Sequence, residues 1–170
     1  MALLPIRTYP DEVLRRKAVP VDKVDRTIRE IIDNMVETMY AYPGIGLAAS
    51  QVGINLRLTT IDLSVGEEPG KLIVLCNPEI ILAEGTQKND EGCLSVPDFS
   101  ETVSRPQKMV VRGKNAKGEE IQIEADGLLA RCLSHEIDHL NGVLFVDHLS
   151  SLKRSLIRNK IKKLARAGEW

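Results

Sequence analysis

Cysteines are scarce in this sequence, which has three among 170 residues, at positions 76, 93 and 132. So small and odd a number excludes a disulfide scaffold and is typical of proteins from a reducing compartment. Long apolar runs are also missing, since no stretch approaches the ~20 residues that a membrane-spanning helix needs. The first residues, MALLPIR, lack the basic and apolar regions of a signal peptide. We therefore expect a cytoplasmic protein with no membrane partner.

An excess of charge is absent as well, because 23 Lys and Arg residues nearly balance 24 Asp and Glu residues, for a net charge of −1. No global electrostatic field points to nucleic acid as the main partner, so we expect no sequence-specific binding of nucleic acid. The length of the chain suits one compact domain with a hydrophobic core of its own.

The apolar spacing of an amphipathic helix occurs first over residues 26–40. Either Asp25 or Thr27 is the expected N-cap, and Thr27 with Glu30 fits a capping box. The helix should end before Pro43-Gly44.

Two further helices are predicted in the C-terminal part of the chain. One should begin near Asp126, a favourable N-cap, and end at Leu140, where Asn141-Gly142 supplies a left-handed stop. The other spans residues 150–167, and its predicted apolar stripe consists of Leu152, Leu156, Ile157, Ile161, Leu164 and Ala165.

The middle of the chain has the patterns of β-strands. Residues 56–60 alternate, and the short apolar run at residues 72–76 should end at Asn77-Pro78. Residues 109–124 are predicted to form two strands joined by a hairpin turn at residues 115–118. A helix, several antiparallel strands and then helices indicate an α+β fold.

The most informative segment is His135-Glu136-Ile137-Asp138-His139. Histidines four residues apart lie on one face of a helix with Cβ atoms roughly 5–6 Å apart, so both imidazoles can bind one metal ion. The glutamate between them can address a water on that metal, as in metal-dependent hydrolases. Taken alone, however, a helix can contain this spacing without a metal.

A catalytic metal of this kind needs three protein ligands, and the residues alone leave the third open among carboxylates and thiols. Cys93 lies in residues 91–97, with a flexible glycine before it and a proline after it. Cys132 is one turn before His135, but three ligands along one helix suit a tetrahedron poorly. Cys76, within an apolar run, is more typical of a small buried hydrophobe.

A second segment of interest is residues 44–51, with the sequence Gly-Ile-Gly-Leu-Ala-Ala-Ser-Gln. Its glycines and alanines leave the backbone bare, so a substrate chain could lie against it. It lacks the lysine and the context of a phosphate-binding loop.

Residues 44–51, 91–97 and 135–139, in this order and at these intervals, resemble the three signature motifs of the peptide deformylase family. The resemblance covers the chain from about residue 3 to about residue 150. It implies a metal-dependent hydrolase that removes the N-formyl group from the N-terminal methionine of nascent polypeptides and releases formate. It also implies antiparallel β-sheets packed around a central metal-binding helix, with N-terminal and C-terminal helices.

The resemblance further implies roles for individual residues. The implied metal ligands are Cys93, His135 and His139. Glu136 is the implied general acid/base toward a metal-bound water that attacks the formyl carbon. Gln51 and the backbone N–H of Leu94 are the implied donors that hold the formyl oxygen. The residues implied along the bound peptide are Gly44, Ile45, Gly46, Leu128 and Cys132.

The metal implied by the resemblance is Fe2+, for which Zn2+, Ni2+ or Co2+ can substitute, although the ligand types alone fit zinc at least as well. Asn89 and Arg131 stand at positions where the family usually has apolar residues. They leave open which side chain the site prefers at the first residue of the peptide substrate. We expect Arg131 to keep its guanidinium in water at the pocket rim. Glu91 and Arg105 are expected to form an ion pair that braces the Cys93 loop.

Residues 1–149 are expected to form a single catalytic domain, with residues 150–170 as a basic amphipathic helix of the same domain. Such a charged face is commonly just solvated. Similar helices of bacterial deformylases are thought to dock near the ribosomal exit, and RNA phosphate would attract the charge. The predicted partners are therefore N-formyl-methionyl peptides and the ribosome. The basic residues are Lys153, Arg154, Arg158, Lys160, Lys162, Lys163 and Arg166.

Two other classes of protein remain open. One is a metallopeptidase with the same helical motif that cleaves internal peptide bonds; the other, less favoured, is a metal-stabilised binding module. A protease commonly uses a carboxylate or another histidine as its third ligand, whereas a structural metal is held by four protein ligands. The number and type of protein ligands therefore distinguish the three classes.

Overall fold

The structure, a computed structural model, describes residues 2–170. The helices within this range are η1 (Glu12–Arg15), α1 (Arg26–Ala41), η2 (Ala49–Val52), α2 (Leu128–Leu140), η3 (Phe145–His148) and α3 (Ser151–Arg166), where η denotes a short 3-10 helix. The strands are β1 (Gly46–Ala48), β2 (Leu58–Ile61), β3 (Ile73–Glu84), β4 (Gln87–Cys93), β5 (Val96–Arg105), β6 (Lys108–Lys114) and β7 (Glu120–Asp126).

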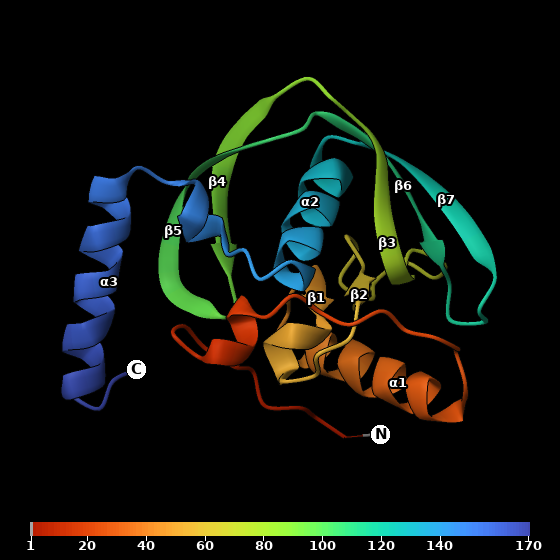
Figure 1. The fold of residues 1–170 in the computed structure, drawn as a ribbon, viewed down its shortest axis with the longest axis horizontal. Helices are drawn as coiled ribbons and strands as arrows, with labels where there is room; N and C mark the ends of the chain where they lie inside the picture. Colours follow the sequence, from red (N-terminus) through yellow and green to blue (C-terminus); the bar gives the residue numbers. More distant parts are fainter. Residues whose placement is uncertain (1) are drawn as a thin grey trace.

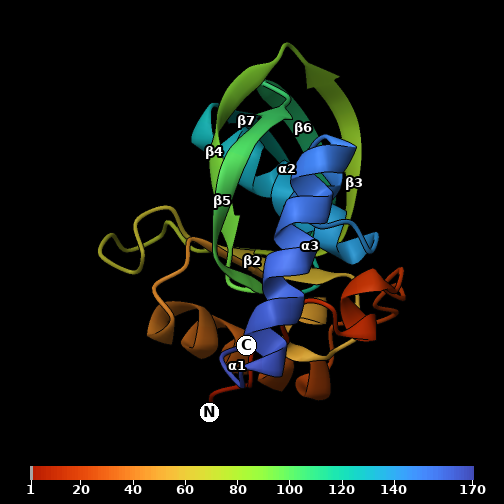
Figure 2. The same ribbon diagram turned by 90° about the vertical axis from the view of Figure 1, so that its left-hand side faces the viewer.

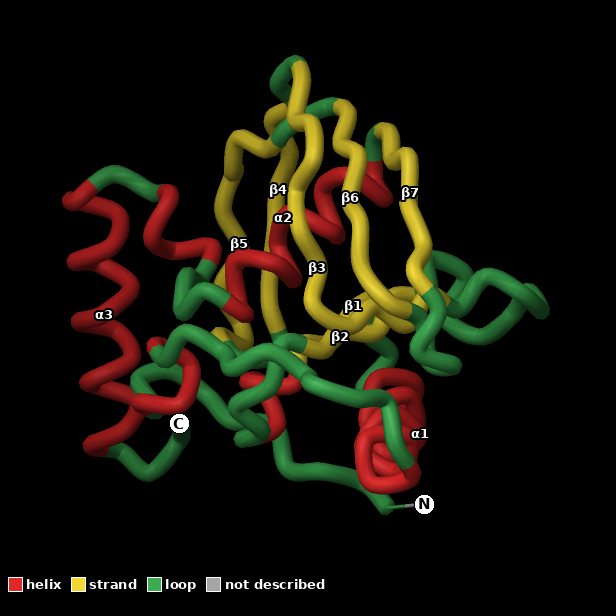
Figure 3. The backbone as a smooth tube through the Cα atoms, turned by 45° about the vertical axis from the view of Figure 1, so that its right-hand side comes forward, coloured by secondary structure: helices red, strands yellow, loops and turns green. Residues whose placement is uncertain are grey.

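The strands form two antiparallel sheets that enclose α2. The larger sheet has the order β1-β2-β3-β6-β7, and the smaller is the β4–β5 hairpin. In Figure 1, α2 lies between β4 and β5 on one side and β3, β6 and β7 on the other. Figure 3 shows β3, β6 and β7 side by side along α2, with α1 below β1 and β2. This arrangement confirms the predicted α+β fold, with sheets around a central helix and a helix toward each end of the chain.

Within the described residues, the three larger groups of buried side chains hold these elements together. The first packs α1 against β1 and β2 and includes Met35, Met39, Leu47 and Leu58. The second lies between α2 and the larger sheet and includes Ile61, Leu75, Met109, Leu133 and Ile137. The third joins β5, η3 and α3 and includes Val96, Val103, Phe145, Ile157 and Ile161. Because α2 is packed on several sides, the side chains it presents inward are held in place.

α1 confirms the first predicted helix. Asp25 is its N-cap, because the carboxylate accepts a hydrogen bond from the backbone N–H of Ile28 at 3.0 Å. The predicted capping box of Thr27 and Glu30 is wrong, since Thr27 lies inside the first turn. The helix ends at Ala41, before the proline, as predicted.

β3 continues through Asn77-Pro78, where we had expected the strand to end. Asn77 has a φ of 52°, and the pairing with β6 shifts register between Cys76 and Glu79. The side-chain amide of Asn77 makes two hydrogen bonds to the backbone of Val21, at 2.7 and 2.8 Å. These bonds to a distant segment stabilise a bulge, so the strand resumes beyond the proline.

The β6–β7 hairpin is as predicted. Its strands pair from Lys108↔Asp126 to Lys114↔Glu120, around the turn at residues 115–118. In that turn the side chain of Asn115 accepts hydrogen bonds from the backbone N–H groups of Lys117 and Glu119, at 2.9 and 3.0 Å. Such side-chain bonds are the reason that asparagine favours turns.

α2 begins at Leu128, and the predicted N-cap role of Asp126 is wrong. Asp126 is the last residue of β7, and its carboxylate accepts a hydrogen bond from Gln107 at 2.7 Å. Gly127, with a φ of 60°, occupies the cap position without a side-chain bond. The predicted stop is confirmed, because α2 ends at Leu140 and Gly142 has a φ of 76°.

α3 has nearly the predicted bounds, but its apolar stripe is only partly buried. Ser150 is the N-cap and accepts a hydrogen bond from the backbone N–H of Lys153 at 3.2 Å. Ile157 and Ile161 are buried in the third group of the core, whereas Leu152 and Leu156 are 70% and 53% exposed. The predicted stripe is therefore too wide, since α3 lies outside β5 at the edge of the molecule (Figures 1 and 2).

No helix in the described part of the chain is both long enough and apolar enough to cross a membrane.

Candidate metal centre and substrate cavity

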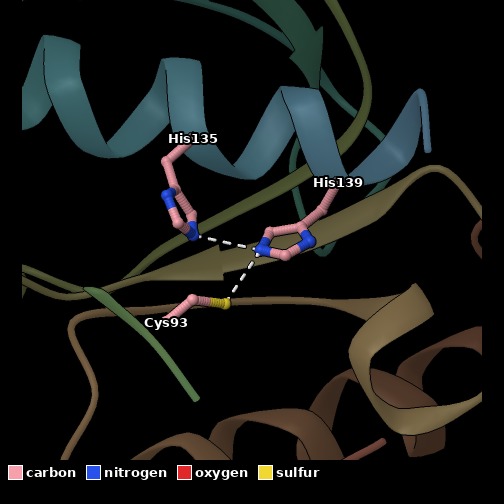
Figure 4. A group of neighbouring side chains, drawn as sticks. All are labelled: Cys93, His135 and His139. Carbon is pink, nitrogen blue, oxygen red and sulfur yellow. Dashed lines mark hydrogen bonds between the residues drawn. The ribbon is translucent and has the colours of Figure 1, made fainter. Parts of the chain in front are cut away.

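Three side chains far apart in the sequence converge beside α2. The helix places His135 and His139 one turn apart, and their Nε2 atoms are 3.0 Å from each other. Cys93, the last residue of β4, has its Sγ 3.3 Å from Nε2 of His139 (Figure 4). All three donor atoms lie within 4.8 Å of one another. Cys132 is outside this group, and its Sγ is 4.0 Å from the backbone oxygen of Ile45.

The chemistry of this group suits a divalent transition metal. A thiol and two imidazoles are the donors that zinc, iron and similar ions accept, and three protein donors are typical of catalytic sites. Burial keeps the pKa of His139 well below its ordinary value, so this imidazole is neutral, the form that binds a metal. Burial also acts to lower the pKa of His135, but hydrogen bonds to Cys93 and Glu91 raise it to about 10. The negative groups that raise the pKa of His135 would also attract a metal cation.

Glu91 orients the first histidine. One of its carboxylate oxygens is hydrogen-bonded to Nδ1 of His135, so Nε2 of the same ring points to Cys93 and His139. Arg105 donates from Nη2 and Nε to the same carboxylate, at 2.5 and 3.1 Å, which confirms the predicted ion pair. Burial alone would raise the pKa of Glu91, but the bonds to His135 and Arg105 lower it to about 2. Glu91 is therefore an anion that steadies the histidine.

Arg131 does not keep its guanidinium in water, contrary to our expectation. The side chain is only 8% exposed, and Nη1 donates to the second oxygen of Glu91 at 2.7 Å. Nη2 donates to the backbone oxygen of Val103 at 3.2 Å. The carboxylate of Glu91 thus lies between two guanidinium groups, and these buried acceptors explain why Arg131 folds inward. Asn89 is exposed.

The same network reaches the surface through Asp138. Nη1 of Arg105 donates to this carboxylate at 2.5 Å, and Nε2 of His148 lies 2.7 Å from it. The sequence analysis assigned no role to His148 or Thr59, because their partners lie on other elements. No spacing pattern within the chain pointed to them.

Glu136 is 2% exposed and faces the metal group from the side. One carboxylate oxygen is 3.8 Å from Nε2 of His135, and the other accepts a hydrogen bond from Oγ1 of Thr59 at 3.4 Å. Burial raises the pKa of Glu136 to about 7. A Cβ atom on Gly46 would lie 3.1 Å from Cδ of Glu136 and 3.0 Å from Sγ of Cys132. A glycine at this position therefore allows β1 to pass close to the carboxylate.

Gln51 lies in η2 with its side chain directed at the same group. Its Oε1 accepts a hydrogen bond from the backbone N–H of Ala48 at 2.9 Å. Its Nε2 then points to Oγ of Ser95 and Sγ of Cys93, at 3.2 and 3.4 Å. The amide donor is consequently beside the candidate metal ligand and next to the turn that contains Leu94.

These residues open onto one cavity of about 710 Å³. Its volume falls in the range of sites for small ligands. Every residue to which the resemblance gave a metal-binding, catalytic or peptide-binding role lines this cavity except His139, which is fully buried. The predicted residues along the cavity are Gly44, Ile45, Gly46, Gln51, Cys93, Leu94, Leu128, Cys132, His135 and Glu136. Lining residues that the sequence analysis missed include Asp98, Phe99 and Ser100.

Comparisons with known proteins agree with this picture. The sequence model of the polypeptide deformylase family matches residues 3–155. A peptide deformylase of Acidobacterium capsulatum is 51% identical over 170 residues, which cover all of both chains. One from Cellvibrio japonicus is 52% identical over 169 residues and 99% of each chain.

Solved structures are similar as well. A crystal structure of a peptide deformylase from Legionella pneumophila superimposes with a TM-score of 0.91 at 44% identity, covering 98% of this chain and 97% of that one. The Ehrlichia chaffeensis enzyme in complex with actinonin has a TM-score of 0.89 at 41% identity, covering 96% of this chain and 98% of that one.

Proposed function

The chain belongs to the polypeptide deformylase family, and from this premise we propose that Cys93, His135 and His139 hold its catalytic metal. The family consists of metal-dependent amide hydrolases, and this chain removes the N-formyl group from nascent polypeptides. The observation that carries the assignment of residues is the convergence of one sulfur and two ring nitrogens beside a buried glutamate. A divalent ion held by them supplies a Lewis acid that acidifies water and polarises a carbonyl.

Glu136 is the proposed general acid/base. With a pKa of about 7, its carboxylate can accept a proton and return it at neutral pH. It takes a proton from the attacking water and delivers it to the amine nitrogen that leaves the formyl carbon. The hydrogen bond from Thr59 holds one carboxylate oxygen, and the other remains near His135.

Gln51 and Leu94 are the proposed donors to the formyl oxygen, which gains negative charge during the attack. The position of Nε2 of Gln51, 3.4 Å from Sγ of Cys93, supports this role. Leu94 follows Cys93 directly and lines the same cavity, which supports a role for its backbone N–H. Removal of one such donor typically lowers turnover by about 10²–10³-fold.

The peptide is proposed to lie along residues 44–46, with its first side chain in an apolar pocket. Residues proposed to line that pocket are Ile45, Leu128, Cys132 and His135. A formyl group has only hydrogen beyond its carbonyl carbon, so a site fitted to it crowds an acetyl group. One methyl group is worth about 1–3 kcal/mol in such discrimination.

Parallel assays test the function directly. Formyl-Met-Ala should release formate with this protein, and a blocked peptide without a formyl group should stay intact. We infer that Fe2+ is the native ion, with Zn2+, Ni2+ or Co2+ as substitutes. Protein purified without oxygen should then contain iron and lose activity in air, because Fe2+ beside a thiolate is readily oxidised. Cleavage of the blocked peptide would instead indicate a peptidase.

We also propose that residues 1–149 form the catalytic domain and that α3, as part of it, contacts the ribosome. The seven basic side chains of α3 are all exposed, and within residues 2–170 an ion pair is found only for Lys153 among them, with Glu101. The seven side chains surround the exposed part of α3, and such a concentration of positive charge attracts RNA phosphate.

Reversing three of these charges should weaken binding to ribosomes. The variant Arg154→Glu, Arg158→Glu and Lys162→Glu should sediment less with ribosomes and show a shallower dependence of affinity on salt. The matched control is reversal of three exposed lysines elsewhere, Lys88, Lys108 and Lys117. Equal binding by both variants, or binding that ignores salt, contradicts the proposal.

A further inference from the structure

Phe99 lines the substrate cavity from a part of β5 that is not fixed by strand pairing. Gly92 pairs with Ser100, whereas the next residue of β4, Cys93, pairs with Val96. Residues 97–99 therefore have no partner on β4 and bulge out of the hairpin. Within this bulge Asp98 has a φ of 67°. Side chains in such a bulge depend on tertiary contacts for their orientation.

Trp170, the last residue of the chain, supplies a contact of this kind. Its ring packs edge-on against Phe99, with the centroids 5.9 Å apart and the planes at 60°. This is a favourable geometry for two aromatic rings. The indole N–H donates to the backbone oxygen of Tyr9 at 2.5 Å. The backbone N–H of Tyr9 in turn donates to the backbone oxygen of Ser95 at 2.8 Å. The indole is thus held from two directions.

α3 brings Trp170 to this position. Ile157 and Ile161 are buried in the same group of side chains as Val96, and Phe99 and Trp170 pack against that group. Nζ of Lys153, near the start of the helix, is 3.1 Å from the carboxylate of Glu101 on β5. The helix therefore contacts β5 near its start and, through Trp170, beyond its end. Figure 2 shows α3 running beside β5.

We propose that Trp170 is a positioning residue, which holds Phe99 as the wall of the cavity against the part of the peptide that follows the first residue. This rests on the proposed function of the cavity. The residues proposed for the chemistry and for the first side chain do not include Phe99, so its ring is available to later residues. Packing of α3 against β5 should consequently strengthen the binding of peptides longer than two residues.

Steady-state kinetics with two substrates test the proposal. Trp170→Ala should raise KM for a formyl pentapeptide by about 2- to 10-fold, the loss of one aromatic pair, with kcat unchanged. KM for formyl-Met-Ala should not change. Trp170→Phe should restore most of the affinity, because a ring still meets Phe99. Leu152→Ala, on the exposed side of α3, is the matched control and should match the unsubstituted protein.

A double-mutant cycle separates positioning from a general structural role. If Trp170 acts through Phe99, Trp170→Ala should have no further effect on KM in a Phe99→Ala background. Additive effects, or equal changes in KM for both substrates, overturn the proposal. Activity of the unsubstituted protein on formyl-Met-Ala is measured alongside. If the unsubstituted protein has no such activity, the proposed function is refuted. If it is active but Trp170→Ala does not affect KM for the pentapeptide more than KM for formyl-Met-Ala, only the role of Trp170 is refuted.

Fluorescence gives an independent readout, because Trp170 is the only tryptophan. In a Glu136→Gln protein, which should not turn over, a saturating formyl pentapeptide should change the emission of Trp170. Formyl-Met-Ala should leave it unchanged. An emission that does not respond to the pentapeptide, or responds equally to the dipeptide, overturns the proposal.

Discussion

Glu136→Ala is expected to leave a folded protein that binds its metal but releases formate about 10²–10⁴ times more slowly. Glu136 is the proposed carrier of the proton transfers, and among the described residues no other carboxylate beside the metal group is free to replace it. The other nearby acid, Glu91, is hydrogen-bonded to His135 and paired with Arg105 and Arg131. Its pKa of about 2 makes it a poor base at neutral pH.

The measurements are formate release from formyl-Met-Ala, metal content per chain, and the circular dichroism of the folded state. Glu136→Gln, which keeps the shape of the side chain, should be as inactive as Glu136→Ala. Glu124→Ala, an exposed position on β7, is the control and should retain full activity. A rate within tenfold of the unsubstituted protein, in either variant of Glu136, would refute its assignment as general acid/base.

The second large effect is expected from Cys93→Ala, which should bind metal poorly and have no measurable activity. Loss of residues that only orient ligands typically lowers metal affinity by about 10–100-fold, and loss of a ligand should cost more. The two imidazoles that remain are only two of the three protein ligands that a catalytic site needs. Added metal should therefore not restore full turnover.

Competition with a chelator measures this affinity, and the other two cysteines provide matched controls. Cys76→Ala removes a buried thiol from the core beneath β2, where burial raises its pKa to about 11. Cys132→Ala removes a thiol from the same side of α2 as the histidines. Both variants should retain one metal per chain. If Cys132→Ala loses the metal and Cys93→Ala keeps it, the proposed ligand set is wrong.

The parts of the fold that could be predicted from the sequence are those that local interactions decide. α1 and the β6–β7 hairpin follow from apolar periodicity and from turn residues such as Asn115. The histidine pair follows from the helical repeat alone, since residues four apart must share a face. The end of α2 follows from Gly142, which can adopt a positive φ.

The errors fall where a distant partner competes with a local preference. Asp126 is a good N-cap by type, but pairing between β6 and β7 places it in a strand. Asn77-Pro78 would end an isolated strand, but hydrogen bonds to Val21 stabilise a bulge there. Arg131 would stay in water on an isolated helix, but Glu91 offers it a buried acceptor.

The sequence by itself determined that a helix carries two histidines one turn apart with a glutamate between them, and its resemblance to a family indicated the reaction. The same resemblance pointed to Cys93 and to the pair of Glu91 with Arg105. Only the tertiary structure decided that Arg131 also holds Glu91 and that Trp170 packs against Phe99. The physical reason is the range of the interactions. Helical periodicity acts over four residues, whereas the chain must fold before Cys93 can approach His139 or Trp170 can approach Phe99.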